Sequence, residues 1–154
     1  MVESLYRYNM QERIGMDNII IKKQYQDNDL IELRVTAQSE IICVYQSCYV
    51  QDSAIINNAN RIIAFSSNYE EDVYLEFGVK TGNYTPAFSM LIMKADSFGY
   101  LKIEMDMEID DNDIRSHRCK FYINSELGLV ERFGYKLKAL TTTSEEGTEI
   151  SLIQ

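Results

Sequence analysis

From Tyr100 to Asp110 the chain alternates apolar and charged residues without interruption. Apolar residues occupy the odd positions from 101 to 109, and the even positions hold Lys102, Glu104, Asp106, Glu108 and Asp110. Successive side chains of a β-strand point to opposite faces, so this pattern predicts a strand with one face on a core and the other in water. Such half-buried strands are typical of antiparallel sheets.

Three further strands are predicted around this one. Val73–Val79 also alternates, whereas Ala87–Lys94 is apolar on both faces, which predicts a central position in the sheet. In Ser116–Asn124 the apolar residues fall on one face. Short turns at 81–83, 96–99 and 111–113 separate the four strands, so the C-terminal half is expected to form an antiparallel meander.

The N-terminal half has its own strand patterns. Ile19–Lys23 is rich in β-branched residues, and Leu30–Gln38 alternates apolar and polar residues. Ile41–Val50 is apolar on both faces, which predicts a central strand. Glu149–Ile153 is a candidate edge strand.

Two helices complete the expected fold. Apolar residues recur at helical spacing in 53–65 and again in 125–140, where Ser125 is the expected N-cap. Gly128 and Gly134 lower helix propensity, which close packing against the sheet would explain. The sequence thus predicts an α+β fold of antiparallel sheets with two packed helices.

The length of 154 residues suits a single domain spanning residues 1–154. Residues 1–15 are polar and show no clean period, so we expect a short helix or a loosely ordered arm there. No apolar run approaches the ~20 residues that span a bilayer, and the first residues lack the apolar core of a signal peptide. The expected location is the cytoplasm.

The charge indicates which partners to expect. Fifteen Lys and Arg against 24 Asp and Glu leave a formal net charge of -9. The long-range field of such a protein repels nucleic acid and anionic membranes and attracts a basic protein. The alternative is that acidity only keeps the domain soluble.

Patterns that would indicate catalysis or a cofactor are weak. His117 and Cys119 would share one strand face about 6.7 Å apart, too far for a dependable nucleophile–base hydrogen bond. Cys43 and Cys48 should point to opposite faces, which leaves three reduced, mostly buried thiols. In the acidic run 106–113 the sixth position of a calcium loop would be Asp111 instead of glycine. We therefore expect no enzyme activity, no metal and no cofactor.

Two acidic clusters are the candidate partner-binding residues, and a solvated surface is the alternative for both. They comprise Glu70, Glu71 and Asp72 before one strand, and Asp106, Glu108 and Asp110 on another. Tyr74, Tyr100 and Tyr122 are expected to be exposed, either as interface anchors or as ordinary sheet-surface residues.

Three stretches of the C-terminal half carry a family resemblance. They are GYLKIEMDMEIDDN, CKFYI and ELGLVERFGYKL, which begin at Gly99, Cys119 and Glu126. Through them, residues 73–140 resemble a group of bacterial immunity proteins. The resemblance points to the CdiI-type and WapI-like proteins that accompany the toxins of contact-dependent growth inhibition. It implies a cytoplasmic protein without enzyme activity that covers the basic active site of a cognate toxin, often an RNase or DNase.

Two functions from different classes follow. The first is a toxin-neutralising immunity protein that uses the acidic residues above. The second is a β-rich accessory domain that binds a small molecule or carbohydrate on a tyrosine-bearing sheet face.

Overall fold

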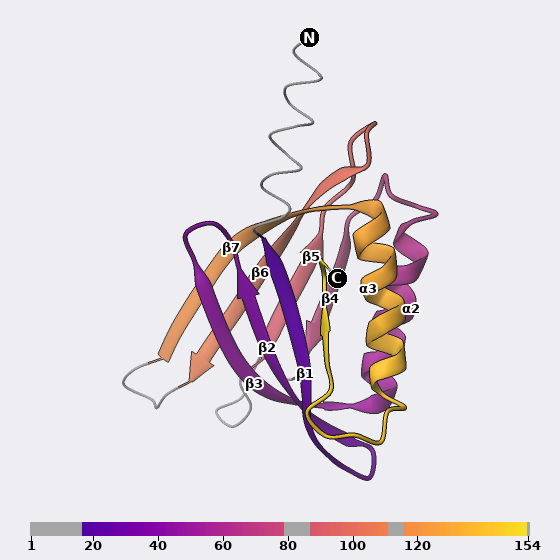
Figure 1. Cartoon of the computed structure of the whole chain (residues 1–154). Helices are drawn as coiled ribbons and strands as arrows, with labels where there is room; N and C mark the ends of the chain where they lie inside the picture. Colours follow the sequence, from indigo (N-terminus) through magenta and orange to yellow (C-terminus); the bar gives the residue numbers. More distant parts are fainter. Residues whose placement is uncertain (1–16, 79–86, 111–115, 154) are drawn as a thin grey trace.

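The structure, a computed structural model, describes residues 17–78, 87–110 and 116–153. The expected N-terminal arm and the turns at 81–83 and 111–113 lie outside these residues. The described part contains eight strands and two helices (Figure 1). In chain order they are β1 (Asn18–Asp27), β2 (Leu30–Gln38), β3 (Cys43–Gln51), α2 (Asp52–Phe65), β4 (Val73–Phe77), β5 (Phe88–Ile92), β6 (Tyr100–Asp110), β7 (Ser116–Glu126), α3 (Leu127–Leu140) and β8 (Glu149–Ser151).

The strands form two four-stranded antiparallel sheets. Sheet A has the order β3-β2-β1-β8 and sheet B the order β4-β5-β6-β7. Sheet B is the expected C-terminal meander with β5 inside it, and β8 is an edge strand, so these predictions are confirmed. In Figure 1 the strands of sheet A cross in front of those of sheet B.

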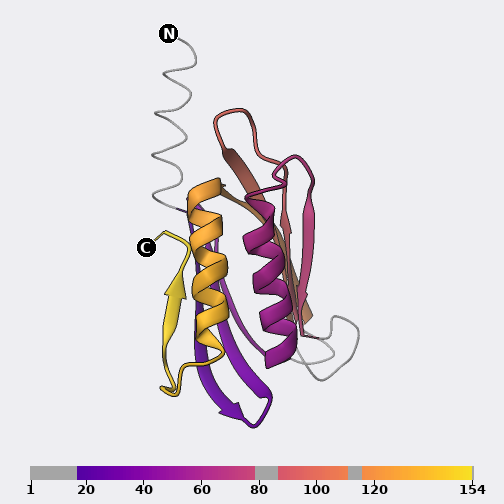
Figure 2. The same cartoon turned by 90° about the vertical axis from the view of Figure 1, so that its right-hand side faces the viewer.

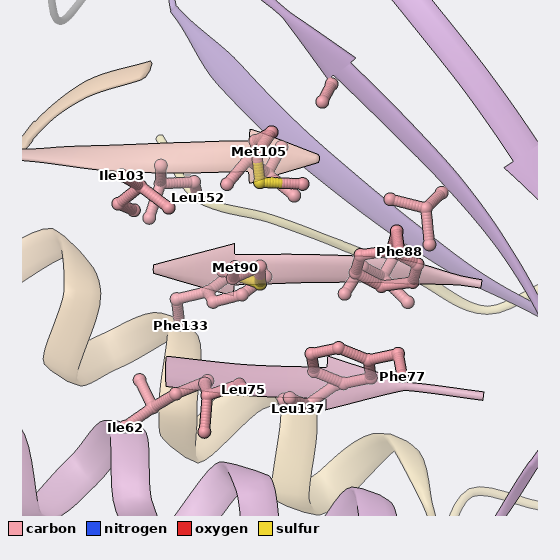
Figure 3. Packing of buried hydrophobic residues seen from close by; sticks show 14 of the residues in the cluster. Ile62, Leu75, Phe77, Phe88, Met90, Ile103, Met105, Phe133, Leu137 and Leu152 are labelled. Carbon is pink, nitrogen blue, oxygen red and sulfur yellow. The ribbon is translucent and has the colours of Figure 1, made fainter. Parts of the chain in front are cut away.

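Both helices lie on the same side of the two sheets (Figure 2). They run side by side, with α3 next to β8 and α2 next to β4. Buried side chains from both sheets and both helices belong to one hydrophobic cluster. Figure 3 shows part of it, where Phe77 and Phe88 stack with ring centroids 4.6 Å apart. One shared core makes this an α+β single-domain fold.

Three local predictions are wrong. The strand β3 lies at the edge of sheet A instead of its centre. Ser125 is buried in β7 and its hydroxyl has no partner among the described residues, while Glu126 occupies the N-cap of α3. A Cβ on Gly134 would meet Ile62 and Ile63 of α2, so this glycine packs against a helix, whereas Gly128 has open space around it.

No helix in the described part of the chain is long and apolar enough to cross a membrane.

Candidate protein-binding surface

The acidic face of β6 is paired within the protein. Asp106 is 5% exposed and accepts two hydrogen bonds from Arg118 of β7, at 2.9 Å from Nε to Oδ1 and 2.6 Å from Nη2 to Oδ2. These bonds raise the pKa of the Arg118 guanidinium, with a smaller contribution from Glu108, which lies directly opposite. The carboxylate of Asp106 is therefore bound to a side chain of the neighbouring strand.

Glu104, two residues earlier, is also engaged. Its Oε1 lies 3.3 Å from the Nζ of Lys120 in β7. A hydrogen bond from the Tyr122 hydroxyl to Glu104 raises the pKa of that tyrosine. Basic residues of β7 thus neutralise much of the acidic stripe that the sequence displays on β6.

The other predicted cluster is exposed. Glu70, Glu71 and Asp72 lie between α2 and β4, and Asp72 Oδ1 accepts a hydrogen bond from the backbone N–H of Lys94 at 2.8 Å. Asp72 also borders an open hollow of about 300 Å³, which is lined by Lys94, Asp96 and Lys102 as well. Its lining therefore contains amines beside the carboxylates and is not purely acidic.

The six predicted residues do not form one patch. In the register of sheet B, Val73 lies in one row with Ile92 and Ile103. Asp72 is therefore level with residue 102, and Asp106 lies four residues further along β6, about 13 Å away along the strand. The side chain of Asp110 lies outside the described residues. The contact of these six with a partner stays a prediction.

Of the three tyrosines expected at the surface, Tyr74 and Tyr122 are exposed. Tyr100 is only 8% exposed, so its predicted exposure is wrong. It packs with Phe98 and Leu129 in a small cluster of its own. Tyr100 is the first residue of β6, and the preceding residue, Gly99, accepts a backbone hydrogen bond from Leu127 at the start of α3.

The outer face of sheet A is a candidate binding surface that was not predicted from the sequence. Several of the exposed large apolar side chains belong to this face, namely Tyr25, Leu30, Tyr45 and Tyr49. In both views the face is not covered by either helix. The guanidinium carbon of Arg34 lies 5.0 Å from the ring centroid of Tyr45, a cation–π contact within the face. The alternation of these tyrosines with buried residues along β3 is the signal that could have revealed it.

An open hollow adjoins this face. Its volume is about 700 Å³, and it runs from Leu30 and Tyr49 past Ala54 to Glu76. It therefore joins the edge of sheet A to the end of β4. Exposed aromatic and aliphatic side chains beside a hollow are typical of a binding surface.

The cysteines do not gather. Cys48 is buried and Cys43 is exposed, which confirms their predicted opposite faces but not the burial of Cys43. Cys119 is half-buried, and the side chain of His117 lies outside the described residues. Among the residues that the structure describes, no three His, Cys, Asp or Glu side chains are grouped as metal ligands.

Comparisons with known proteins gave no match to a protein-family model, to a curated protein or to a solved structure. Among the described residues, the features that bear on function are the exposed acidic residues 70–72, the aromatic outer face of sheet A, which neither helix covers, and the hollow beside it.

Proposed function

We propose that this chain is a cytoplasmic immunity protein that binds a basic toxin domain, a nuclease, and covers its active site. The observation that carries the proposal is the outer face of sheet A, which neither helix covers and where exposed tyrosines adjoin a hollow on a protein of net charge -9. Tyrosine is among the residues enriched in binding hot spots because it buries a large, rigid area. The proposed mode of action is occlusion, without chemistry on the toxin.

The charge supports the same partner. A nuclease active site is basic because it holds phosphate groups, so an acidic inhibitor associates with it quickly. Charge complementarity sets mainly the association rate, while buried anchors set the lifetime of the complex. An acidic protein with exposed aromatic anchors meets both requirements.

Co-expression tests this proposal. The chain is produced with the toxin domain encoded beside its own gene, and growth, co-purification and nuclease activity are measured. We expect restored growth, a stable complex and loss of nuclease activity. If growth is not restored and no complex forms, the proposal is overturned.

Charge reversal then tests the predicted acidic residues. Glu70→Lys, Glu71→Lys and Asp72→Lys in one variant should slow association at low salt by more than the control variant. The control reverses Glu145, Glu146 and Glu149, which are also exposed and change the net charge equally. Equal slowing in both variants would mean that only the overall charge matters, and that 70–72 are not contacts.

The hollow beside Tyr49 favours a second candidate, an accessory domain that binds a small molecule or carbohydrate. Its volume of about 700 Å³ is within the range of ligand pockets, although it is open. A thermal-shift panel of sugars and small metabolites separates the two functions, because only the second predicts a ligand-dependent rise in unfolding temperature.

A further inference from the structure

A β-bulge in β1 turns Tyr25 toward solvent. The pairing of β1 with β2 is regular from Asn18 to Lys23, then shifts so that Tyr25 lies opposite Glu32. Lys23 and its partner Leu33 both point into the core. Strict alternation would put Tyr25 on the same inner face as Lys23, but the extra residue Gln24 reverses it, and Tyr25 is 49% exposed. Bulges commonly re-aim a side chain in this way at functional sites.

The bulge completes a row of three side chains across sheet A. Glu32 of β2 lies between Tyr25 of β1 and Tyr49 of β3 in the register of the sheet. The strands are about 4.8 Å apart, so the two tyrosine backbones are separated by about 10 Å, with the carboxylate between them. Tyr49 is 48% exposed. Within the described residues, none of these three side chains has a hydrogen-bond or ion-pair partner.

A similar row on sheet B shows what this one lacks. That row consists of Tyr74, Leu91, Glu104 and Tyr122. There Lys120 and the Tyr122 hydroxyl engage the Glu104 carboxylate, and Tyr74 donates its hydroxyl to Glu76 at 2.8 Å. The row on sheet B is satisfied within the protein, whereas the row on sheet A offers a carboxylate flanked by two aromatic rings.

We propose that Tyr25, Glu32 and Tyr49 form the seat for an arginine side chain of the protein partner. This inference rests on the proposed function and names the contact chemistry. With each ring standing above its own strand, a guanidinium midway between them would lie about 5 Å from each, within the range of a cation–π contact. Arg34 already makes a cation–π contact of 5.0 Å with a single ring, Tyr45, on the same face. Arginine fits better than lysine because its planar fork stacks on rings and binds a carboxylate through two N–H groups.

Neighbouring charges determine the direction of approach. The next row toward the middle of the sheet contains Lys22 and Arg34, which repel a cation. On the other side Asp27 and Asp29 are exposed in the β1–β2 hairpin, at the lower end of the sheet in Figure 1. An arginine therefore approaches from the hairpin side. It meets Glu32 where the negative potential of the hairpin gives way to the positive potential of Lys22 and Arg34.

The hollow beside the row accommodates the segment that carries the arginine. It begins at Leu30 and Tyr49 and extends to Glu76. A partner loop seated there would bury the exposed Leu30 side chain and place its basic residue beside Tyr49. The apolar contact and the cation seat would then belong to one interface.

The first test uses peptides on the full chain. The probe is acetyl-Gly-Arg-Gly-amide, and the control peptide replaces arginine with citrulline, which has a similar shape but no charge. In amide NMR titrations the arginine peptide should shift the resonances of Tyr25, Glu32 and Tyr49, with affinity about fivefold above that of the citrulline peptide. Equal shifts from both peptides, or shifts that map elsewhere, would overturn the proposal.

Matched variants make the test specific. Glu32→Gln keeps the shape of the side chain and should weaken the arginine peptide about fivefold, while Glu104→Gln on the similar row should leave its affinity unchanged. Tyr49→Ala is a second variant at the seat, checked by its unfolding temperature. An unchanged affinity in Glu32→Gln contradicts the seat.

The outcomes for the seat and for the proposed function are distinguishable. A chain whose Glu32→Gln and Tyr49→Ala variants still bind and neutralise the toxin with full affinity keeps its function and loses the seat. A chain that binds the arginine peptide through Glu32 but neither binds nor neutralises the neighbouring toxin keeps the seat and loses the function.

Discussion

The guanidinium of Arg118 binds both carboxylate oxygens of Asp106, and the two residues belong to adjacent strands of sheet B. The side chain of Asp106 is 7% exposed and that of Arg118 is 58% exposed, so the acid is the buried member of the pair. A buried carboxylate that is held by two hydrogen bonds from one guanidinium acts mainly in the structure of the protein and less in the recognition of a partner.

Replacement of this acid should therefore affect stability. Asp106→Asn removes the charge and leaves one oxygen to accept from Arg118, so we expect the midpoint of thermal unfolding to fall by about 5 °C. Glu108→Gln is the control, since Glu108 lies opposite Arg118 but is not the residue that its guanidinium binds. A fall of the same size in both variants would show that the specific pair is unimportant.

The contact between the two helices depends on Gly134. A Cβ at this position would lie 2.8 Å from Cγ1 of Ile63 and 3.1 Å from its backbone nitrogen. Gly134→Ala should lower the free energy of unfolding by about 1–3 kcal/mol, although alanine favours helix formation. Gly128→Ala, with no atom within 4 Å of the new Cβ, should instead raise it by about 0.5 kcal/mol. Urea denaturation of both variants checks the opposite signs, and stabilisation by Gly134→Ala would contradict the close packing.

Local patterns predicted most of the fold. The alternation in Leu30–Gln38 gives the bounds of β2 to the residue, and that in Tyr100–Asp110 does the same for β6. The edge position of β3 is hard to predict because Tyr45 and Tyr49 make this strand apolar on both faces in the sequence. A tyrosine has an apolar ring and a polar hydroxyl, so it suits an exposed sheet face as well as a core. A strand with buried residues on one side and tyrosines on the other therefore looks buried on both faces.

The candidate surface was harder to predict because it depends on register. The carboxylates of Asp106 and Glu104 are visible in the sequence, but their partners are set by which residues of β7 lie across from them. Tyr25 follows a polar run without alternation, so the bulge at Gln24 leaves no periodic signal. Long-range pairing decides which charges are neutralised, and that information is not local.

Lys23 secures the C-terminal segment to sheet A. It is 2% exposed, and its Nζ donates a hydrogen bond to the backbone carbonyl of Thr143 at 2.6 Å and lies 3.5 Å from that of Leu140. A cation at this place satisfies carbonyl groups at the C-terminal end of α3. Lys23→Met should lower the free energy of unfolding by about 2 kcal/mol. Lys22→Met, at a half-exposed position, should change it by less than about 0.5 kcal/mol, and calorimetry of the pair checks the difference.

The buried thiol of Cys48 makes the free energy of unfolding depend on pH in the alkaline range. Burial raises the pKa of its thiol from 9.0 to about 12, and the Glu32 carboxylate adds a smaller contribution. Below pH 9 the thiol keeps its proton in both the folded and the unfolded chain, so its full contribution to stability is present. Between about pH 9 and 12 the unfolded chain releases this proton and the folded chain retains it, so stability falls by up to about 1.4 kcal/mol per pH unit.

Urea denaturation from pH 8 to 11 measures this contribution. Lysines and tyrosines also titrate in that range, so the informative quantity is the difference in slope between the native chain and Cys48→Ala. We expect a shallower fall in the variant, because it lacks the buried thiol, even though its stability at pH 8 is lower. Cys43→Ala, on the exposed face of the same strand, should keep the native slope. Identical slopes in all three proteins would show that the Cys48 thiol ionises as easily in the folded chain as in the unfolded one.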